Sequence, residues 1–562
     1  MILHAEERVF NIERIEKRPP AGGARPADAP QTLRSAALPC LVVAGSVKSC
    51  LVRKGRSEMK LTPEMALEYH LGGKIGLKLT KRLDDSQTLS LAYTPGVAEV
   101  CKAIVQDRNV LYSHTAKSNL VAVVSDGTAV LGLGDIGAAA GIPVMEGKCA
   151  LFRTFGEVDA WPVTFENARV NGNSGPTDVD KVVEFTAAIA NMYGGINLED
   201  IAAPACFDVE DRLQEMLDIP VFHDDQWGTA VITLAGVINY CVITGKAMDE
   251  LKVAVNGAGA AGVRIAQMIM AAGVKDLLLI DTKGVCHSGR DDLNPFKRTY
   301  AVDTAARTHR DALAGADLAI MVSNRFNRDG SRSCEPSWLK EMNHYPGIFS
   351  MANPDPEIYP DEAREVFGDK PYIMSTGRSD FPNQVNNVLG FPFIFRGALD
   401  VRAKRISMNM KIAAAEGLAR LARESVPDDV KRAYGGQELE FGPGYIIPKP
   451  FDRRLLTFEA LAVAQAAVKD GDARVSDISN YPQYLAALAF TPKIEFAARA
   501  EISKTVRFED NWILIDEKKR NGGCAYLCDA GVETGGASPD SLVGKRVELA
   551  LNDGKVKKID IL

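Results

Sequence analysis

The chain has 562 residues, of which 46% are hydrophobic and 25% are charged, the balance of an ordinary globular protein rather than of a disordered or fibrous chain. Asp and Glu outnumber Lys and Arg by 73 to 66, so the net charge is -7 and no basic excess favours nucleic acid as a partner. No uninterrupted apolar stretch reaches the ~18 residues that span a bilayer, so we expect no membrane association. The 10 cysteines include no CxxC pair, which is typical of free thiols in a reducing, cytoplasmic compartment.

Changes in pattern divide the chain into four predicted segments. Residues 1–58 include a loop-like stretch rich in proline and glycine, which predicts a disordered extension, and their acidic residues argue against a targeting peptide. From residue 59 onward apolar runs alternate with helical segments, which predicts an α/β fold whose parallel sheets are covered on both faces. We place one domain at 59–228, a doubly wound Rossmann-type domain at 229–475, and a small β-rich extension of unassigned role at 476–562.

Individual elements follow from apolar periodicity and from glycine and proline breaks. The expected strands are Leu120–Val124, Leu251–Val255, Leu277–Ile280, Leu318–Val322 and Ile348–Met351. The expected helices are Lys181–Met192, Thr229–Cys241 and Ala260–Ala272. Near the end of the chain, two alternating runs flank the turn Asn552-Asp553-Gly554-Lys555, which predicts a β-hairpin.

A glycine-rich turn lies between a predicted strand and a predicted helix. This G-x-G-x-x-G turn is typical of dinucleotide binding, because its glycines let the backbone approach a pyrophosphate at a helix N-terminus. Asp281 ends the next strand, where an acid would bind ribose hydroxyls. Asp281 would repel the 2′-phosphate of NADP and Lys283 would attract it, although Lys283 is better interpreted as a solvated turn residue, so NAD and NADP both stay open. The residues of the turn are Gly257, Ala258, Gly259, Ala260, Ala261 and Gly262.

A second G-x-G-x-x-G match occurs at Gly132–Gly137. We expect Pro143 to interrupt any helix after it, which is a poor setting for a nucleotide. We therefore interpret this segment as a tight loop beside the active site.

Two pairs of adjacent acids, Glu199-Asp200 and Asp224-Asp225, stand near apolar strands. Converging carboxylates suit a hard divalent cation, Mg²⁺ or Mn²⁺. The alternative is that each pair is an exposed cap or turn. His223, beside the second pair, is better interpreted as a packed histidine than as a ligand.

Eight segments in this order resemble the malic enzyme family, and the resemblance covers about residues 59–475. They are Tyr93–Gly96, Leu131–Asp135, Gly141–Pro143 with Gly147-Lys148, Leu198–Asp200, His223–Thr229, Val255–Gly259, Met351–Pro354 and Asn386-Asn387.

The resemblance implies oxidative decarboxylation of malate to pyruvate and CO₂ with NAD or NADP and a divalent cation. It implies Lys148 as general base and Tyr93 as general acid, and it places Asn353 and Asn387 around the substrate and the nicotinamide. Because a base must be neutral, we expect burial and nearby cations to lower the pKa of Lys148. The implied metal ligands are Glu199, Asp200 and Asp225.

The chain departs from the family pattern at Ala129, where many members carry an arginine that pairs with a substrate carboxylate. Arg378 and Arg402 are weak replacements that are more easily interpreted as structural, and Trp227 is interpreted as a packing change. The family implies a homodimer or a higher oligomer. Two other functions stay open: a malolactic-type enzyme that releases lactate, and a non-catalytic sensor of dinucleotides or metabolites.

Overall fold

The computed structural model describes residues 62–490, except 78 and 173, and the strands between 495 and 561 with gaps between them. The predicted extension at 1–58 lies outside the described residues. Contacts within the chain define one compact unit at 57–491 and a second that includes 492–562, and each is considered by itself.

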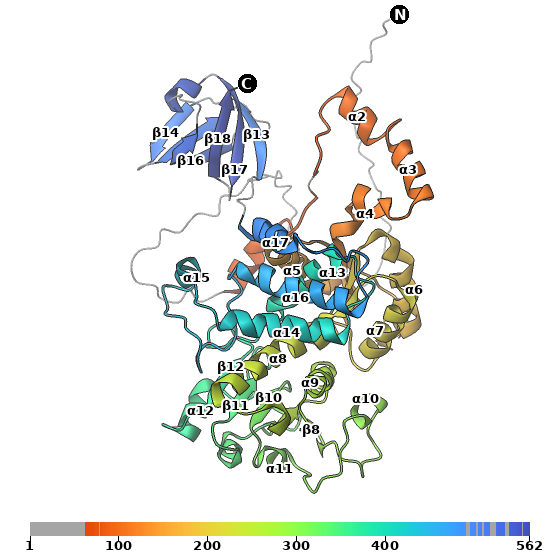
Figure 1. The fold of residues 1–562 in the computed structure, drawn as a ribbon, viewed down its shortest axis with the longest axis vertical. Helices are drawn as coiled ribbons and strands as arrows, with labels where there is room; N and C mark the ends of the chain where they lie inside the picture. The colour runs from red at the N-terminus through yellow and green to blue at the C-terminus, as the bar shows by residue number, and fades with distance from the viewer. Residues whose placement is uncertain are drawn as a thin grey trace, which may run out of the picture. The chain divides into compact units, whose positions relative to one another are not determined.

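The first described segment is a run of short helices that we call the helical arm, residues 62–115. Thr62 and Asp85 cap its first two helices with side-chain oxygens. Every residue of the four helices is described and none is buried. Figure 1 shows α2 and α3 projecting from the sheets of this unit. The helices are α1 (Pro63–Tyr69), α2 (Ser86–Ala92), α3 (Val97–Gln106) and α4 (Val110–His114).

A four-stranded parallel sheet follows, with strand order β2-β1-β5-β6. Its edge strand β2 was not predicted, because Pro162 interrupts the apolar run, and proline is tolerated at a sheet edge. The expectation that Pro143 ends a helix is wrong, since α5 continues through it. The elements are β1 (Leu120–Ser125), α5 (Ala138–Gly156), β2 (Asp159–Thr164), β3 (Arg169–Asn171), β4 (Ser174–Thr177), α6 (Val179–Ile189), β5 (Gly195–Leu198), α7 (Ala205–Met216) and β6 (Val221–His223).

A six-stranded sheet with the order β12-β11-β10-β7-β8-β9 forms the second part of this unit. All its pairs are parallel except β8 with β9, which confirms the predicted doubly wound parallel sheet. The elements are β7 (Lys252–Asn256), α9 (Ala260–Ala271), β8 (Asp276–Asp281), β9 (Gly284–Val285), α10 (Pro295–Arg298), α11 (His309–Leu313), β10 (Leu318–Met321), β11 (Gly347–Ser350), α12 (Pro360–Phe367) and β12 (Ile373–Thr376).

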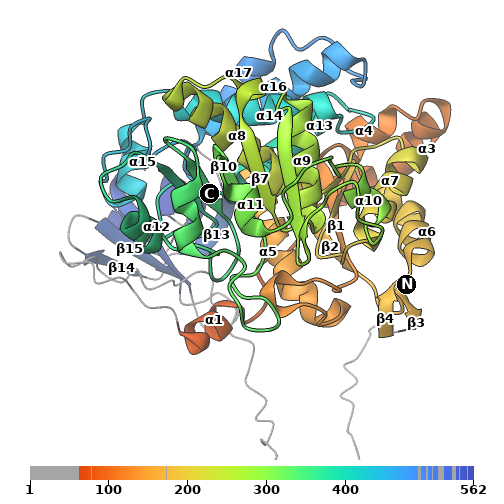
Figure 2. The ribbon, with the colours of Figure 1, turned by 90° about the horizontal axis from the view of Figure 1, so that it is seen from below.

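The helix between the two sheets, α8 (Asp224–Thr244), begins directly after β6, five residues before the predicted start. Acids in a first turn are favoured by the helix dipole, so Asp224 and Asp225 start the helix. Among the described residues α8 alone is long and apolar enough to cross a membrane, yet it is mostly buried and contacts α9 and the later helix α14 (Figure 2). The later helices are α13 (Phe391–Asp400), α14 (Met408–Ala422), α15 (Asp428–Ala433), α16 (Arg454–Asp470) and α17 (Tyr481–Phe490).

Short 3₁₀ turns connect several of these elements. They are η1 (Ala116–Asn119), η2 (Leu131–Leu133), η3 (Ala190–Met192), η4 (Met248–Glu250), η5 (Pro336–Glu341), η6 (Asn387–Leu389) and η7 (Pro539–Leu542).

The second unit contains a six-stranded sheet with the order β13-β17-β18-β16-β15-β14. The predicted hairpin is confirmed, because β17 and β18 pair antiparallel with Val547 opposite Ile561. The strands are β13 (Glu495–Glu501), β14 (Lys504–Phe508), β15 (Asn511–Asp516), β16 (Cys524–Glu533), β17 (Arg546–Asn552) and β18 (Lys555–Ile561).

Candidate active site

Lys148, on α5, stands at the centre of a buried charged cluster. Its Nζ lies 2.6 Å from Asp224 Oδ2 and 2.8 Å from Glu199 Oε1. The ammonium also lies over the ring of Phe391, 4.4 Å from the ring centre. Residues 76 apart in the sequence are thus in direct contact, because α5 and the first turn of α8 meet at the end of β5.

The carboxylates predicted to bind metal converge beside this lysine. One oxygen each of Glu199, Asp200 and Asp225 lies within 4.8 Å of the others. Glu199 directly follows β5, and its Oε2 accepts a hydrogen bond from Asn197 at 2.8 Å. Asp200 adopts the left-handed conformation with φ 54°, and its backbone N–H donates to Asp225 Oδ2 at 2.8 Å. The two acid pairs are therefore parts of one cluster rather than exposed turns.

The expected direction of the Lys148 pKa is wrong for this arrangement. Burial by itself lowers the pKa, but the attraction of Asp224 and Glu199 outweighs burial and raises the pKa well above its ordinary value. Burial in turn raises the pKa of Glu199 and of Asp224. The sequence-based expectation assumed neighbouring cations, whereas the neighbours are carboxylates.

Two local features hold Asp224 in place. Asn387, in η6, donates through Nδ2 to Asp224 Oδ2 at 3.1 Å, and Thr229 donates to the Asn387 side-chain oxygen at 3.0 Å. Gly228 leaves room for the carboxylate, because a Cβ atom there would lie 2.1 Å from Asp224 Oδ1. Asn387 therefore lies beside the cluster, and its predicted place around the substrate and the nicotinamide stays a prediction.

The glycine turn after β7 has the geometry of a dinucleotide site. Gly257 has φ 115°, and a Cβ on Gly262 would lie 1.9 Å from the Gly257 carbonyl oxygen, so both positions need glycine. Around Gly259 no described atom lies within 4 Å of the Cβ position, so the turn is open there. A cavity of about 440 Å³ begins at this turn, where the order of strands reverses between β7 and β10. Asp281 and Asn353 line the cavity together with Gly257, Ala258 and Gly259.

The second glycine motif lies next to this region. A Cβ on Gly132 would lie 3.6 Å from Pro354 and 3.7 Å from the Asn353 carbonyl oxygen. Gly134 and Gly137 have positive φ. These contacts agree with a tight loop beside the site.

The structure does not bring Tyr93 to the cluster. Tyr93 ends α2 in the helical arm, where its side chain is 70% exposed. Arg378 pairs with Asp380 at 2.7 Å, and Arg402 lies over Tyr112, so both have the structural roles expected of them.

A buried network behind the acids was missed by sequence reasoning. Glu210, on α7, accepts hydrogen bonds from the His223 backbone N–H at 3.1 Å and from Trp227 Nε1 at 2.9 Å. Its Oε2 also lies 3.3 Å from Arg264 on α9, and Lys411 lies 3.5 Å from the centre of the Trp227 ring. The sequence signal that could have revealed this network is Glu210, an acidic residue at an otherwise apolar position of α7. Trp227 is therefore a hydrogen-bonding residue as well as a packing residue.

His223 itself is fully buried, and its ring nitrogens make no hydrogen bond to any described residue. Burial lowers its pKa to about 4, so the ring is neutral, as expected of a packed histidine.

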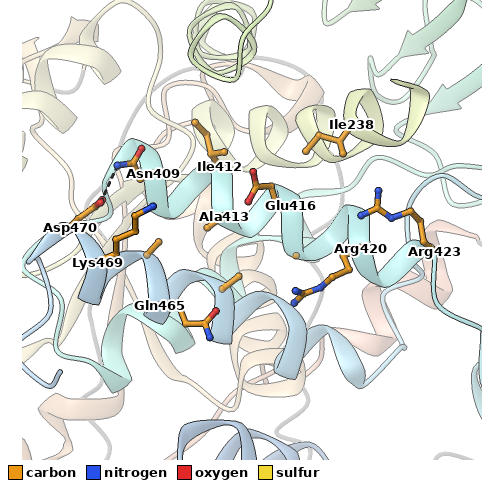
Figure 3. Close-up of a pocket in the computed structure, with 13 residues that line it drawn as sticks. Ile238, Asn409, Ile412, Ala413, Glu416, Arg420, Arg423, Gln465, Lys469 and Asp470 are labelled. Atoms are coloured by element: carbon orange, nitrogen blue, oxygen red, sulfur yellow. Dashed lines mark hydrogen bonds between the residues drawn. The ribbon is translucent and has the colours of Figure 1, made fainter. Parts of the chain in front are cut away.

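Another cavity lies elsewhere, as a groove of about 730 Å³ along α14 and α16 (Figure 3). Arg420 and Arg423 of α14 and Lys469 of α16 line it, and all three side chains are exposed. It contains none of the predicted site residues.

Comparisons with known proteins show the family of the chain. The family model "Malic enzyme, N-terminal domain" matches residues 72–214, and "Malic enzyme, NAD binding domain" matches residues 227–326. The NADP-dependent malic enzyme of Halomonas elongata is 48% identical over 424 residues, which are 75% of this chain and 96% of that protein. The NADP-dependent malic enzyme of Rhizobium meliloti is 48% identical over 440 residues, 77% of this chain and 56% of that protein, so the chain spans about half the length of this relative.

A crystal structure of malic enzyme from Pyrococcus horikoshii is also similar, with a TM-score of 0.66 and 40% identity over 76% of this chain and 95% of that one. Both matched domain models lie in the unit that carries the cluster and the glycine turn. The chain therefore belongs to the malic enzyme family.

Proposed function

We propose that this chain catalyses the oxidative decarboxylation of malate to pyruvate and CO₂ with NAD or NADP and Mg²⁺ or Mn²⁺. The observation that carries the proposal is the position of Lys148 between Asp224 and Glu199, beside three acids whose oxygens converge. We assign residues 59–228 to substrate and metal binding and residues 229–475 to the dinucleotide. No role is assigned to 476–562.

The acids fit a hard divalent cation. Glu199, Asp200 and Asp224 are buried, and Lys148 pairs with two of them, Glu199 and Asp224. Uncompensated buried carboxylates are unfavourable, and oxygen donors are what Mg²⁺ and Mn²⁺ prefer. We assign Glu199, Asp200 and Asp225 as ligands. A bound cation would polarise the substrate oxygens and offset the carboxylates that hold the proton on Lys148.

Proton transfers are assigned to two residues. Lys148 removes the C2 hydroxyl proton of malate. Asn387 donates a hydrogen bond to Asp224 and so holds this carboxylate beside Lys148. Tyr93 donates a proton to C3 after CO₂ leaves. Asn353 and the glycine turn orient the nicotinamide dinucleotide, the hydride acceptor.

The exposure of Tyr93 supports a homodimer or higher oligomer. The helical arm carries many exposed apolar side chains, and clustered apolar exposure marks an interaction surface. In this assignment the arm packs against a second copy, which buries these side chains and brings Tyr93 to a site. The most exposed are Leu67, Tyr69, Leu71, Leu77, Leu79, Leu91 and Val105.

Absorbance at 340 nm tests the proposal on the full chain with L-malate, with and without Mn²⁺, and separately with NAD and NADP. A metal-dependent rise is the expected result. A relative from Bacillus subtilis, 46% identical, is named a bifunctional malic/malolactic enzyme, so lactate is measured in parallel. Lactate without a rise would replace the proposal by the malolactic reaction, and neither product would favour the sensor.

A further inference from the structure

Asp200, one of the assigned metal ligands, has a backbone conformation that needs support from its surroundings. Its φ of 54° lies in the left-handed region, which is unfavourable for a residue with a Cβ atom and persists only where neighbouring contacts fix it. The residue lies in the loop between β5 and α7. The contacts that fix this loop therefore determine where the Asp200 carboxylate lies.

The segment that follows β1 supplies contacts to this loop. The backbone N–H of Ala129 donates to the Asp200 carbonyl oxygen at 3.0 Å. The backbone N–H of Ala202 donates to Thr128 Oγ1 at 2.8 Å. On the other side, the Asp200 backbone N–H donates to Asp225 Oδ2 at 2.8 Å. The loop is thus fixed at Asp200 and two residues after it, and the second of these positions depends on a side-chain hydroxyl group.

Asp126 fixes that hydroxyl group in turn. Its Oδ1 accepts from Thr128 Oγ1 at 2.6 Å and from the Thr128 backbone N–H at 3.1 Å. Its Oδ2 accepts from Thr177 Oγ1 at 2.6 Å, at the end of β4. All three side chains are buried. Because the Thr128 hydroxyl hydrogen is directed to a carboxylate, its oxygen is oriented to accept from Ala202. A chain of hydrogen bonds therefore runs from β4 to the loop of Asp200.

We infer that Thr128 and Asp126 are positioning residues for the divalent cation, because they hold the loop from which Asp200 reaches it. The inference rests on the proposed metal site and adds two residues that are not assigned as ligands. Buried, fully hydrogen-bonded polar groups keep a loop in one arrangement, and loss of the groups that orient metal ligands typically weakens metal binding about 10- to 100-fold. If the chain of hydrogen bonds only stabilised the fold, its loss would lower stability without a specific effect on metal affinity.

Calorimetric titration of the full chain with MnCl₂, in the absence of malate, tests the inference without turnover. Thr128→Val keeps the shape of the side chain but removes the hydroxyl group, so Mn²⁺ affinity should fall about 10- to 100-fold. Thr128→Ser retains the hydroxyl group and should stay close to the wild-type affinity. Thr186→Val is the matched control, because Thr186 is also fully buried but its hydroxyl makes no hydrogen bond to any described residue. Asp200→Asn identifies the part of the Mn²⁺ signal that belongs to this site.

Urea unfolding shows that each variant is folded at the temperature of the titration. Thr177→Val, which removes a donor to Asp126, should lower Mn²⁺ affinity by a smaller factor and serves as the test if Thr128→Val does not fold. Wild-type Mn²⁺ affinity in folded Thr128→Val, or in Thr177→Val where that variant stands in, overturns the inference and leaves the metal assignment intact. An equal loss of affinity in Thr128→Ser also overturns it.

Failure of the proposed metal site gives a different result. If the wild-type chain shows no Mn²⁺ binding that Asp200→Asn removes, the metal assignment fails and the inference fails with it. The proposed reaction is tested separately, because it fails if malate yields no reduced cofactor even though Mn²⁺ binds as expected.

Discussion

Lys148 Nζ and Asp224 Oδ2 lie 2.6 Å apart in a buried pair that joins α5 to the first turn of α8. The general base proposed here is therefore held in its protonated form by its nearest neighbour. The pH dependence of the reaction follows from this pair.

Asp224→Asn removes the strongest attraction that raises the pKa of Lys148, so the pKa falls. A general base acts when deprotonated, so the acidic limb of kcat/KM moves to lower pH. Initial rates from pH 5 to 9 measure the shift. An unchanged limb would mean that another group is the base.

Lys148→Ala should lower kcat by about 10²- to 10⁴-fold, the usual contribution of a positioned acid or base. Lys275→Ala is the control, because Lys275 is 73% exposed and pairs with Asp249, which is also on the surface. Full activity in Lys148→Ala would remove this residue from the mechanism.

Alanine substitutions at two glycines of the dinucleotide turn should affect different properties, one the stability of the fold and the other the affinity for the dinucleotide. Gly262→Ala places a Cβ 1.9 Å from the Gly257 carbonyl oxygen, so the turn must shift and the unfolding free energy falls. Gly259→Ala meets no described atom within 4 Å, so stability changes by less than about 0.5 kcal/mol. Gly259 lines the cavity that we propose for the dinucleotide, so the added methyl group should take up ligand space and lower dinucleotide affinity. Urea unfolding and nucleotide titration of both variants make the comparison, and equal stability of the two would contradict it.

Local patterns predicted much of the fold. The strand, turn and helix from 252 to 271 are visible in the sequence because apolar runs and glycines stand next to each other. The start of α8 was misplaced, since Asp224 and Asp225 look like loop residues until the helix dipole and the acidic cluster are considered. The prediction that Pro143 interrupts a helix was wrong for a similar reason, because tertiary packing stabilises α5 although proline weakens the helix locally.

Contacts between distant residues could not be predicted. The sequence contains Lys148 and Asp224 but does not reveal their contact, so the predicted direction of the Lys148 pKa shift was wrong. Lys297, on the short helix α10, likewise pairs with Asp281, although no motif predicts this contact. Long-range charge pairs determine the electrostatics of a site, and they appear only after folding.

Glu357 should make stability depend on pH. Its Oε1 accepts from the Ser323 N–H at 2.7 Å and its Oε2 from Ser350 at 3.0 Å, which joins the ends of β10 and β11. Burial raises its pKa from 4.5 to about 7. Between these values the unfolded chain releases a proton that the folded chain keeps, so the unfolding free energy falls with rising pH, by about 3 kcal/mol in total, and levels off above pH 7.

Glu357→Gln removes this contribution, so its unfolding free energy minus that of the wild type should rise from pH 4.5 to 7. Urea unfolding at several pH values measures the difference. Exposed Glu438→Gln serves as the control and should run parallel to the wild type. A constant difference for Glu357→Gln would show that this carboxyl ionises normally in the folded chain.

Loss of the Glu210 carboxylate should destabilise the fold more than loss of the neighbouring Asp211 carboxylate. Its carboxylate is fully buried against Arg264 and near Lys411, whose pKa burial lowers to about 8. Glu210→Ala removes the buried acid that pairs with Arg264, leaves the exposed Asp211 beside the guanidinium group, and frees the Trp227 N–H, which should lower the unfolding free energy by about 3–5 kcal/mol. Asp211→Ala removes the other acid of Arg264, also at 3.3 Å, but that side chain is 53% exposed, so the loss should be at most about 1 kcal/mol. Urea unfolding of the two variants compares a buried and an exposed partner of the same guanidinium group. Similar losses would mean that burial does not strengthen the Glu210 pair, and that the network behind His223 does not stabilise the acids of the site.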